Sequence, residues 1–333
     1  MQANAVVFTA PNTVQYAPVT TPEPGPDDVV VRVTHSWISN GTEGSFLRGE
    51  RIEGDTPYSG EQDPWPFPIV AGYQKIGVVE WVGEQIEDLS VGETVFATMG
   101  KVEGMYRERA GQISPSIGGR AGIWKLPEGV DPLAFAGLVL TQVGYNAGTR
   151  PRLEIGDGAI VIGDGLVGQW SAQTLAWRGA QVLLVGRHPD RLEKFAKAPY
   201  CHVVNAREED WIAKAKALFP GGAQAAVDTV GSIDVMEQFQ QVVRRCGHLV
   251  SAGFYGTQDV MALQQPRYGE YSVDLVSGWQ PRRMDETLHL IATGHLQTLP
   301  LITHRFPVAQ AADAWALIES KSEPVLGVIL DWQ

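Results

Sequence analysis

The chain has few cysteines and no long apolar run, and both absences narrow what it can be. Its 333 residues include only Cys201 and Cys246, which excludes a disulfide framework and a cysteine-rich zinc site. No apolar run approaches the roughly 20 residues that cross a membrane. The N-terminus also lacks the charged and apolar regions of a signal peptide. We therefore expect a cytoplasmic protein that makes no membrane contact.

Basic residues are also scarce. The chain has 38 acidic and 26 basic residues and a net charge of −12, which argues against binding to nucleic acid or anionic membranes. A small-molecule substrate is the remaining expectation. The length favours two domains of about 150 residues each over a single core.

The pattern along the chain changes near residue 150. The first hundred residues read as short strands between turns, with apolar runs at 29–33, 77–82 and 91–96. Strands then alternate with helices, which predicts an α/β fold with a doubly wound parallel sheet. The predicted strands are 159–162, 181–185, 202–204, 225–229 and 248–252, and the predicted helices are 166–178, 189–196, 208–219, 233–245 and 282–293. A last strand at 327–332 is expected to rejoin the first domain.

A glycine motif follows the strand at 159–162. Its residues are Gly163, Gly165, Leu166, Val167 and Gly168, in the spacing Gly-x-Gly-x-x-Gly between a strand and a helix. This is the dinucleotide-binding pattern. Gly163 permits a tight turn, Gly165 lets a pyrophosphate approach the backbone, and Gly168 lets helix and strand pack closely. The pyrophosphate is expected on the helix N-terminus.

The end of the next strand bears on the choice of nicotinamide cofactor. An acid there usually holds the ribose hydroxyls of NAD, but this chain has Gly186, followed by Arg187 and by Arg191 one turn later. Without the carboxylate, arginine side chains can pair with a 2′-phosphate. The prediction is NADP(H), and NAD stays open if both arginines are only solvated charges.

The order of these parts resembles the medium-chain dehydrogenase/reductase superfamily over essentially the whole chain. The segments that carry the resemblance are 68–79, 91–96, the glycine motif, 227–231 and 301–306. The resemblance implies a GroES-like, mostly-β catalytic domain at 1–147 and 297–333, and a Rossmann domain at 148–296. It also implies a homodimer that pairs through residues 271–277.

The resemblance extends to the zinc site, but the ligands are missing. Asn40 stands at the position of the family's first ligand, Tyr73 replaces the histidine of Gly-His-Glu, and the third position falls near Val139. We therefore expect no metal, since one carboxylate, Glu43, does not make a tight site. Asn40 and Glu43 resemble the quinone-oxidoreductase-like branch. Residues 39–43, Gly72-Tyr73 and 328–332 resemble more closely the branch around bacteriochlorophyllide hydroxyethyl dehydrogenase.

Without zinc, a side chain must manage the substrate oxygen. Tyr73 is the first candidate, and Lys75 faces the same way if the segment is a strand, which would lower the pKa of the tyrosine. Tyr73 is otherwise a wall residue and Lys75 a surface charge. Asn40 either binds a substrate oxygen or caps a turn. Glu43 either relays a proton or braces the backbone.

Other candidates surround the expected cofactor site. Thr141, on the helix before the Rossmann domain, is expected to flank the nicotinamide. Gly253, Phe254 and Tyr255 follow a Rossmann strand, where ligands usually bind. Asp228 is expected to order a loop. Residues 48–66 are polar and rich in Gly and Pro, and are expected to form a long surface loop.

Three functions remain open from the sequence. The first is a zinc-independent, NADP(H)-dependent oxidoreductase that interconverts an alcohol and a carbonyl. The second is an NADPH-dependent reductase of quinones or α,β-unsaturated carbonyls, and the third is a non-catalytic NADPH-binding sensor. The sequence names neither the substrate nor the direction of the reaction.

Overall fold

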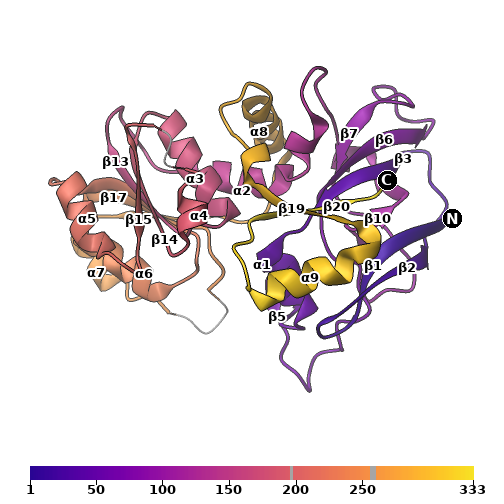
Figure 1. The fold of residues 1–333 in the computed structure, drawn as a ribbon, viewed down its shortest axis with the longest axis horizontal. Coiled ribbons are helices and arrows are strands. Elements are labelled where there is room, and N and C mark those ends of the chain that lie inside the picture. Colours follow the sequence, from indigo (N-terminus) through magenta and orange to yellow (C-terminus); the bar gives the residue numbers. More distant parts are fainter. Residues whose placement is uncertain (196–197, 256–259) are drawn as a thin grey trace. The chain divides into compact units, whose positions relative to one another are not determined.

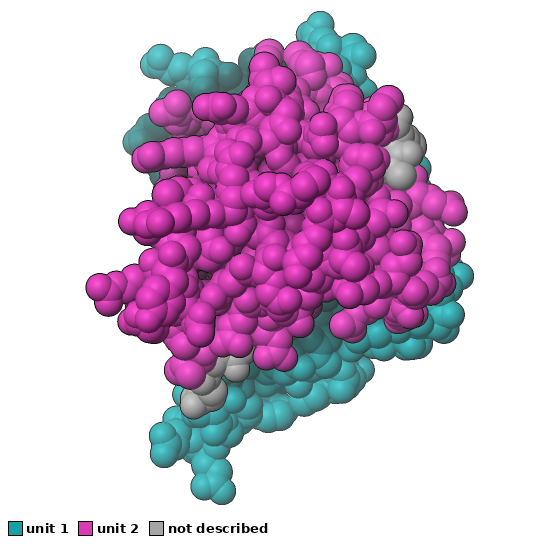
Figure 2. Space-filling view, turned by 90° about the vertical axis from the view of Figure 1, so that its left-hand side faces the viewer, with its two compact units in different colours: residues 1–138, 302–333 teal, residues 139–301 magenta. Residues whose placement is uncertain are grey.

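The computed structural model describes residues 1–195, 198–255 and 260–333, and the chain folds into two compact units (Figure 1). Unit 1 consists of Met1–Leu138 and Ile302–Gln333, and unit 2 is Val139–Leu301; Figure 2 colours them separately. The sequence analysis placed the limits at 147/148 and 296/297. The first limit differs because α2 (Leu138–Thr149), most of which the prediction placed in the first domain, belongs to unit 2 from Val139 on.

Unit 2 is built on a six-stranded sheet with the order β15-β14-β13-β16-β17-β18. Every neighbouring pair in it is parallel. Counted from β13, the order is 3-2-1-4-5-6, which is that of a Rossmann domain, so the predicted doubly wound sheet is confirmed. The strands are β13 (Gly158–Ile162), β14 (Gln181–Gly186), β15 (Cys201–Asn205), β16 (Ala223–Asp228), β17 (Val243–Ser251) and β18 (Ser272–Leu275).

Helices cover both faces of this sheet, because apolar residues alternate along its strands. Ile160 and Leu183 pack with α5 and α6 on one face, whereas Val161 and Leu184 pack with α3 and α4 on the other (Figure 1). The helices of unit 2 after α2 are α3 (Leu166–Trp177), α4 (Pro189–Leu192), α5 (Trp211–Leu218), α6 (Ile233–Gln238), α7 (Gln264–Tyr268) and α8 (Pro281–Ala292), with 3₁₀ turns at Phe239–Gln241 and Leu299–Leu301.

One predicted helix of unit 2 is wrong. The helix expected over 233–245 ends at Gln238, and β17 starts at Val243. Phe239 turns fully into the core, and Val243 pairs with Ala223 of β16, so sheet pairing overrides the helical pattern. For the helix expected at 189–196, the structure shows α4, and its last expected residue, Ala196, lies outside the described residues.

Unit 1 is mostly β. Its largest sheet has the order β12-β7-β6-β3-β20-β19, with β11 paired to β3, and a second sheet has the order β10-β1-β2. The strands are β1 (Gln2–Ala10), β2 (Thr13–Thr20), β3 (Asp28–Trp37), β4 (Arg51–Glu53), β5 (Thr56–Pro57), β6 (Lys75–Val82), β7 (Thr94–Ala97), β8 (Gly100–Lys101), β9 (Arg109–Ala110), β10 (Ile113–Ser114), β11 (Ser116–Gly119), β12 (Ile123–Lys125), β19 (Ile302–Pro307) and β20 (Gly327–Asp331). Its helices are α1 (Asn40–Leu47) and α9 (Ala311–Ser320), with 3₁₀ turns at Arg120–Gly122, Pro132–Phe135 and Val308–Gln310.

The two ends of the chain meet in unit 1. The C-terminal strand β20 pairs with β3 through Ile329 and Trp37, which confirms the predicted return to the first domain. Trp315 of α9 packs edge-on against Phe8 of β1, with the ring centroids 5.3 Å apart. The surface loop expected at 48–66 contains a short hairpin, in which β4 pairs with β5. Among the described residues, no helix has both the length and the apolar character to cross a membrane.

The glycine motif gives a stability test with a matched pair of variants. A Cβ at Gly168 would lie 1.8 Å from the carbonyl oxygen of Gly163, whereas one at Gly165 would meet no atom within 4 Å. We expect Gly168→Ala to lower the free energy of unfolding by about 3 kcal/mol because the backbone must move. Gly165→Ala, at a φ of −73°, should change it little. Urea denaturation measures both, and equal stability of the two variants would contradict this packing.

Candidate active site

The Gly-Tyr-Gln segment of unit 1 is fixed by contact between two backbones. Gly72 has a φ of +92°, and a Cβ on Gly111 would lie 1.9 Å from the carbonyl carbon of Gly72. Glycine therefore suits both positions. The turn directs Tyr73 towards the end of β3, where its hydroxyl donates a hydrogen bond of 2.6 Å to Ser39 Oγ.

The expected pairing of Tyr73 with Lys75 is wrong. Strand β6 begins only at Lys75, so the two side chains do not share a strand face. Lys75 is fully buried, and its Nζ donates to the carbonyl oxygens of Ala110 (3.2 Å) and Gly111 (2.8 Å). It is therefore not a surface charge either. Burial raises the pKa of Tyr73 to about 12 and lowers that of Lys75 to about 7.

Glu43 of α1 lies under the same turn and is fully buried. Its Oε1 accepts 2.8 Å from the backbone N–H of Ser39, and its Oε2 accepts 3.2 Å from Gln112 Nε2. Burial outweighs these hydrogen bonds and raises the pKa of Glu43 to about 7. These contacts are those of a residue that braces the backbone, one of the two roles left open from the sequence.

Asn40, the first residue of α1, does not cap the preceding turn. Its Nδ2 donates 2.9 Å to the carbonyl oxygen of Leu326. Its Oδ1 is buried and has no hydrogen-bond partner among the described residues. Because Leu326 O needs a donor, the amide orientation is fixed and its oxygen is left as an unused acceptor. A buried acceptor without a partner is costly, and a ligand that donates a hydrogen bond removes that cost.

The sequence analysis missed the residues that connect these groups. Gln112 is buried, and its Oε1 accepts from Ser36 Oγ, which in turn accepts 2.8 Å from Trp332 Nε1. A continuous set of hydrogen bonds thus runs from the C-terminus through Gln112 and Glu43 to Ser39 and Tyr73. No local pattern marks Gln112, because it stands 69 residues from Glu43 in the chain.

Unit 2 carries the residues of the candidate cofactor site at the carboxyl ends of β13 and β14. Gly163 has a φ of +114°, and the close approach of Gly168 to Gly163 gives the tight turn and helix packing that the motif predicted. Gly165 precedes α3, and no side chain caps that helix terminus. No Cβ stands in the way at Gly165, and the first N–H groups of α3, at Leu166 and Val167, have no partner within the helix. Both features fit a pyrophosphate.

The expectation that no carboxylate lies at the end of β14 is wrong. Asp164, between the first two glycines, reaches across to Gly186, where a Cβ would lie 2.4 Å from its Oδ2. Arg191 Nη1 donates 3.3 Å to Asp164 Oδ1. The side chain of Arg187 is exposed, and no charged partner for it occurs in the described part of the chain. An acid next to Gly163, together with glycine at 186, was the signal available in the sequence.

The other predicted cofactor residues lie at the ends of β16 and β17. A Cβ on Gly253 would lie 2.0 Å from the backbone N of Gly231, so the two loops pack against each other. Tyr255 donates 2.5 Å to Asp228 Oδ2, and Asp228 also accepts from three backbone N–H groups of residues 230–232. Asp228 therefore orders this loop, as expected. Phe254 is exposed beside it, whereas Thr141 is fully buried in α2.

The residues at the expected zinc positions do not fit a zinc ion. Asn40 offers an amide, Tyr73 a phenol and Val139 an alkyl group, and none of these is a usual zinc ligand. In the described ranges, no three His, Cys, Asp or Glu side chains come together as a metal site. Glu43 is already engaged by two donors.

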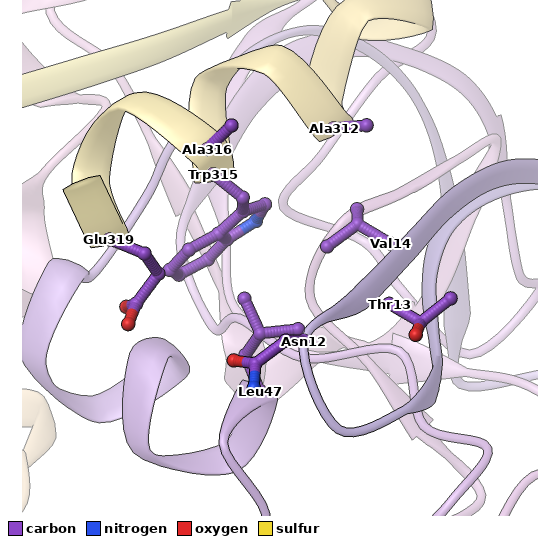
Figure 3. A pocket seen from close by; sticks show the side chains of 8 residues that line it. All are labelled: Asn12, Thr13, Val14, Leu47, Ala312, Trp315, Ala316 and Glu319. Carbon is purple, nitrogen blue, oxygen red and sulfur yellow. The ribbon is translucent and has the colours of Figure 1, made fainter.

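A separate cavity of about 400 Å³ lies elsewhere in unit 1 (Figure 3). It contains none of the predicted site residues. It is bordered by α9 and by the turn between β1 and β2, and its lining residues are Asn12, Thr13, Val14, Leu47, Ala312, Trp315, Ala316 and Glu319.

Part of the chain matches a known family model. Residues 167–293 match the family described as zinc-binding dehydrogenase. The matched segment lies in unit 2 and includes Gly168, Gly186 and Gly253 but none of the zinc positions. The match therefore describes most of unit 2 and no part of unit 1.

Full-length relatives support the same architecture. The 2-desacetyl-2-hydroxyethyl bacteriochlorophyllide A dehydrogenase of Cereibacter sphaeroides is 26% identical, covering 100% of this chain and 99% of its own. An alcohol dehydrogenase from Escherichia coli CFT073, complexed with NADH, superposes with a TM-score of 0.84 at 20% identity, covering 99% of both chains. A putative zinc-binding dehydrogenase from Sinorhizobium meliloti 1021, bound to NADP, gives 0.81 at 19% identity and the same coverage. The two solved structures show the fold.

The buried Glu43 and Lys75 predict two separate pH windows of stability. The pKa of Glu43 is raised from 4.5 to about 7. Its contribution to the free energy of unfolding is therefore fully present below pH 4.5 and is lost as the pH rises through 7. The pKa of Lys75 is lowered from 10.5 to about 7, so stability is recovered as the pH rises from 7 to 10.5. Between pH 4.5 and 7, Glu43→Gln should remove about 3 kcal/mol of the change in the free energy of unfolding, and it should leave the change between pH 7 and 10.5 as in wild type.

Lys75→Met is the matched variant, and it should flatten only the upper window. Urea denaturation between pH 4.5 and 10.5 measures both. If both variants keep the pH dependence of the free energy of unfolding that wild type shows, the result would contradict the burial of these charges.

Proposed function

Since the chain belongs to the medium-chain dehydrogenase/reductase superfamily, we propose that it is a zinc-independent, NADP(H)-dependent oxidoreductase that interconverts an alcohol and a carbonyl by hydride transfer. The observation that carries the proposal is the donor set at the emptied zinc positions. The hydroxyl of Tyr73, bonded to Ser39, and the unused oxygen of Asn40 stand there. The relative named as a hydroxyethyl dehydrogenase, aligned over the full chain, supports this reaction class.

The bound nicotinamide supplies or accepts the hydride, and the side chains of unit 1 manage the substrate oxygen. With a pKa of about 12, Tyr73 stays protonated near neutral pH, and its hydroxyl, which donates to Ser39 Oγ in this structure, turns to donate to the substrate oxygen. A donor aimed at a developing alkoxide stabilises the transition state more than the ground state. Asn40 Oδ1 accepts a hydrogen bond from a hydroxyl of the substrate, which orients it.

Glu43 and Lys75 act as positioning residues in this proposal. Glu43 holds the backbone of Ser39, and Ser39 holds the phenol of Tyr73. Lys75 fixes the carbonyl groups of Ala110 and Gly111, next to Gln112. Ser39 and Tyr73 are thus held in place, and only the hydroxyl proton of Tyr73 must turn from Ser39 Oγ to the substrate oxygen.

The choice of NADP(H) is supported by the end of β14. The side chain of Arg187 is exposed there, and Arg191 Nε is buried without a partner among the described residues. Asp164 is bonded to Arg191 and to backbone N–H groups, so it is not available for ribose hydroxyls. Guanidinium groups next to a satisfied carboxylate favour a 2′-phosphate. Thr141 and Phe254 are retained as proposed cofactor contacts.

The proposed enzyme is a cytoplasmic homodimer. Strand β18 is at the edge of the unit 2 sheet, and Leu275 in it is 79% exposed. An exposed edge with apolar side chains is a surface that a second copy can extend.

A substrate panel tests the proposal. Saturated ketones, sugars and polyols with NADPH or NADP should give turnover that dialysis against a chelator does not change. Turnover lost on dialysis and restored by zinc would refute zinc independence. Turnover of enones or quinones but not of saturated ketones would support the reductase of activated double bonds instead.

Tyr73→Phe separates an enzyme from a sensor. It should lower kcat by about 100- to 1,000-fold, because one donor to the oxyanion is removed. Tyr16→Phe, which removes a hydroxyl elsewhere in unit 1, should leave kcat unchanged. Tight NADPH binding without turnover in any variant would support the sensor.

A further inference from the structure

The carboxylate of Asp164 is nearly saturated with hydrogen bonds from one short segment. Its Oδ2 accepts from the backbone N–H groups of Arg187 (2.7 Å) and His188 (2.8 Å), and His188 Nδ1 lies 2.9 Å away. Its Oδ1 accepts 3.3 Å from Arg191 Nη1. Asp164 is 5% exposed. His188 Nδ1 is also 3.1 Å from Oδ1, so of the about four acceptor positions of the carboxylate few are left for a ribose hydroxyl.

The side chain of Asp164 occupies the space that a side chain at 186 would need. A Cβ on Gly186 would lie 2.4 Å from Oδ2 and 2.5 Å from Cβ of Asp164. Real Cβ atoms do not approach other atoms so closely. A carboxylate on the glycine loop and a carboxylate at the end of β14 therefore exclude each other in this fold.

The same contacts hold Arg191 in place. Nη1 of Arg191 is bonded to Asp164, and its carbonyl oxygen accepts 2.7 Å from Nε2 of Gln169, a fully buried residue of α3. Its Nε remains buried without a partner in the described residues. Arg191 is thus fixed at two points and keeps an unused donor, while Asp164 sets the direction of the backbone at Arg187.

We propose that Asp164 is the positioning residue that sets the cofactor preference of this protein, by replacing an acid at position 186. As an internal counter-ion it holds the 187–191 segment so that Arg187 and Arg191 meet a 2′-phosphate, and it requires glycine at 186. The proposal rests on the NADP(H) preference proposed above. Moving the carboxylate from 164 to 186 frees its oxygens for ribose hydroxyls and changes the preference to NAD(H).

The test compares Kd for NADPH and NADH in the full-length protein by calorimetry, for wild type, Asp164→Ala, Gly186→Asp and the double variant. Asp164→Ala should lower the NADPH/NADH affinity ratio about 10- to 100-fold, the effect of losing a charged hydrogen-bond anchor. Gly186→Asp alone should destabilise the fold. Asp164→Ala with Gly186→Asp should be more stable than Gly186→Asp and should prefer NADH. Such rescue is a coupling that independent sites do not show.

Asp210→Ala is the matched control. Asp210 accepts from the backbone N–H groups of Ile212 and Ala213 at the start of α5. Its loss should lower stability and leave the affinity ratio unchanged. If Asp164→Ala does not fold, Asp164→Asn keeps an acceptor for the two N–H groups and should still lower the ratio, by less.

The outcomes separate this inference from the proposed function. A wild-type preference for NADPH that Asp164→Ala and Asp164→Asn leave unchanged would overturn the inference alone. A wild-type preference for NADH would overturn both. Additive effects on stability in the double variant would overturn the mutual exclusion of the two carboxylates.

Discussion

The hydrogen bonds that Arg187 and His188 donate to Asp164 are the interaction on which the carboxyl ends of β13 and β14 depend. They join the glycine loop after β13 to the end of β14, its neighbour in the sheet. Once the carboxylate is there, glycine is required at 186 and Arg191 has a fixed partner. The glycine motif therefore does more than form the turn after β13, because its second residue also holds the end of β14 through hydrogen bonds.

Unit 1 uses a buried carboxylate differently. Asp164 accepts hydrogen bonds from two backbone N–H groups and a guanidinium, whereas Glu43 accepts them from one backbone N–H group and one side-chain amide. Burial accordingly raises the pKa of Glu43 to about 7. The carboxylate still fixes Ser39, and through it Tyr73. The proposed stabilisation of an oxyanion depends on hydroxyl groups held in this way.

Sequence reasoning succeeded where a local pattern determines the structure. The alternation of strands and helices gave the parallel sheet, and the spacing of Gly163, Gly165 and Gly168 gave the turn and the packing of α3. It failed where a side chain's partner is distant in the chain. Lys75 bonds to carbonyl groups of residues 110–111, and Asp164 bonds to residues 187–191. The helix expected over 233–245 failed for the same reason, because Val243 pairs with Ala223 in the sheet.

The most direct test of the central claim is the position of deuterium in a product. Chelator-treated protein would reduce an α,β-unsaturated ketone with NADPH dideuterated at the nicotinamide C4, and the product would be analysed by NMR. Such a substrate offers both a carbonyl carbon and an activated double bond to the hydride. The account predicts deuterium on the carbinol carbon, at a rate that added zinc does not change. Deuterium on the β-carbon, or transfer that appears only after zinc is added, would contradict it.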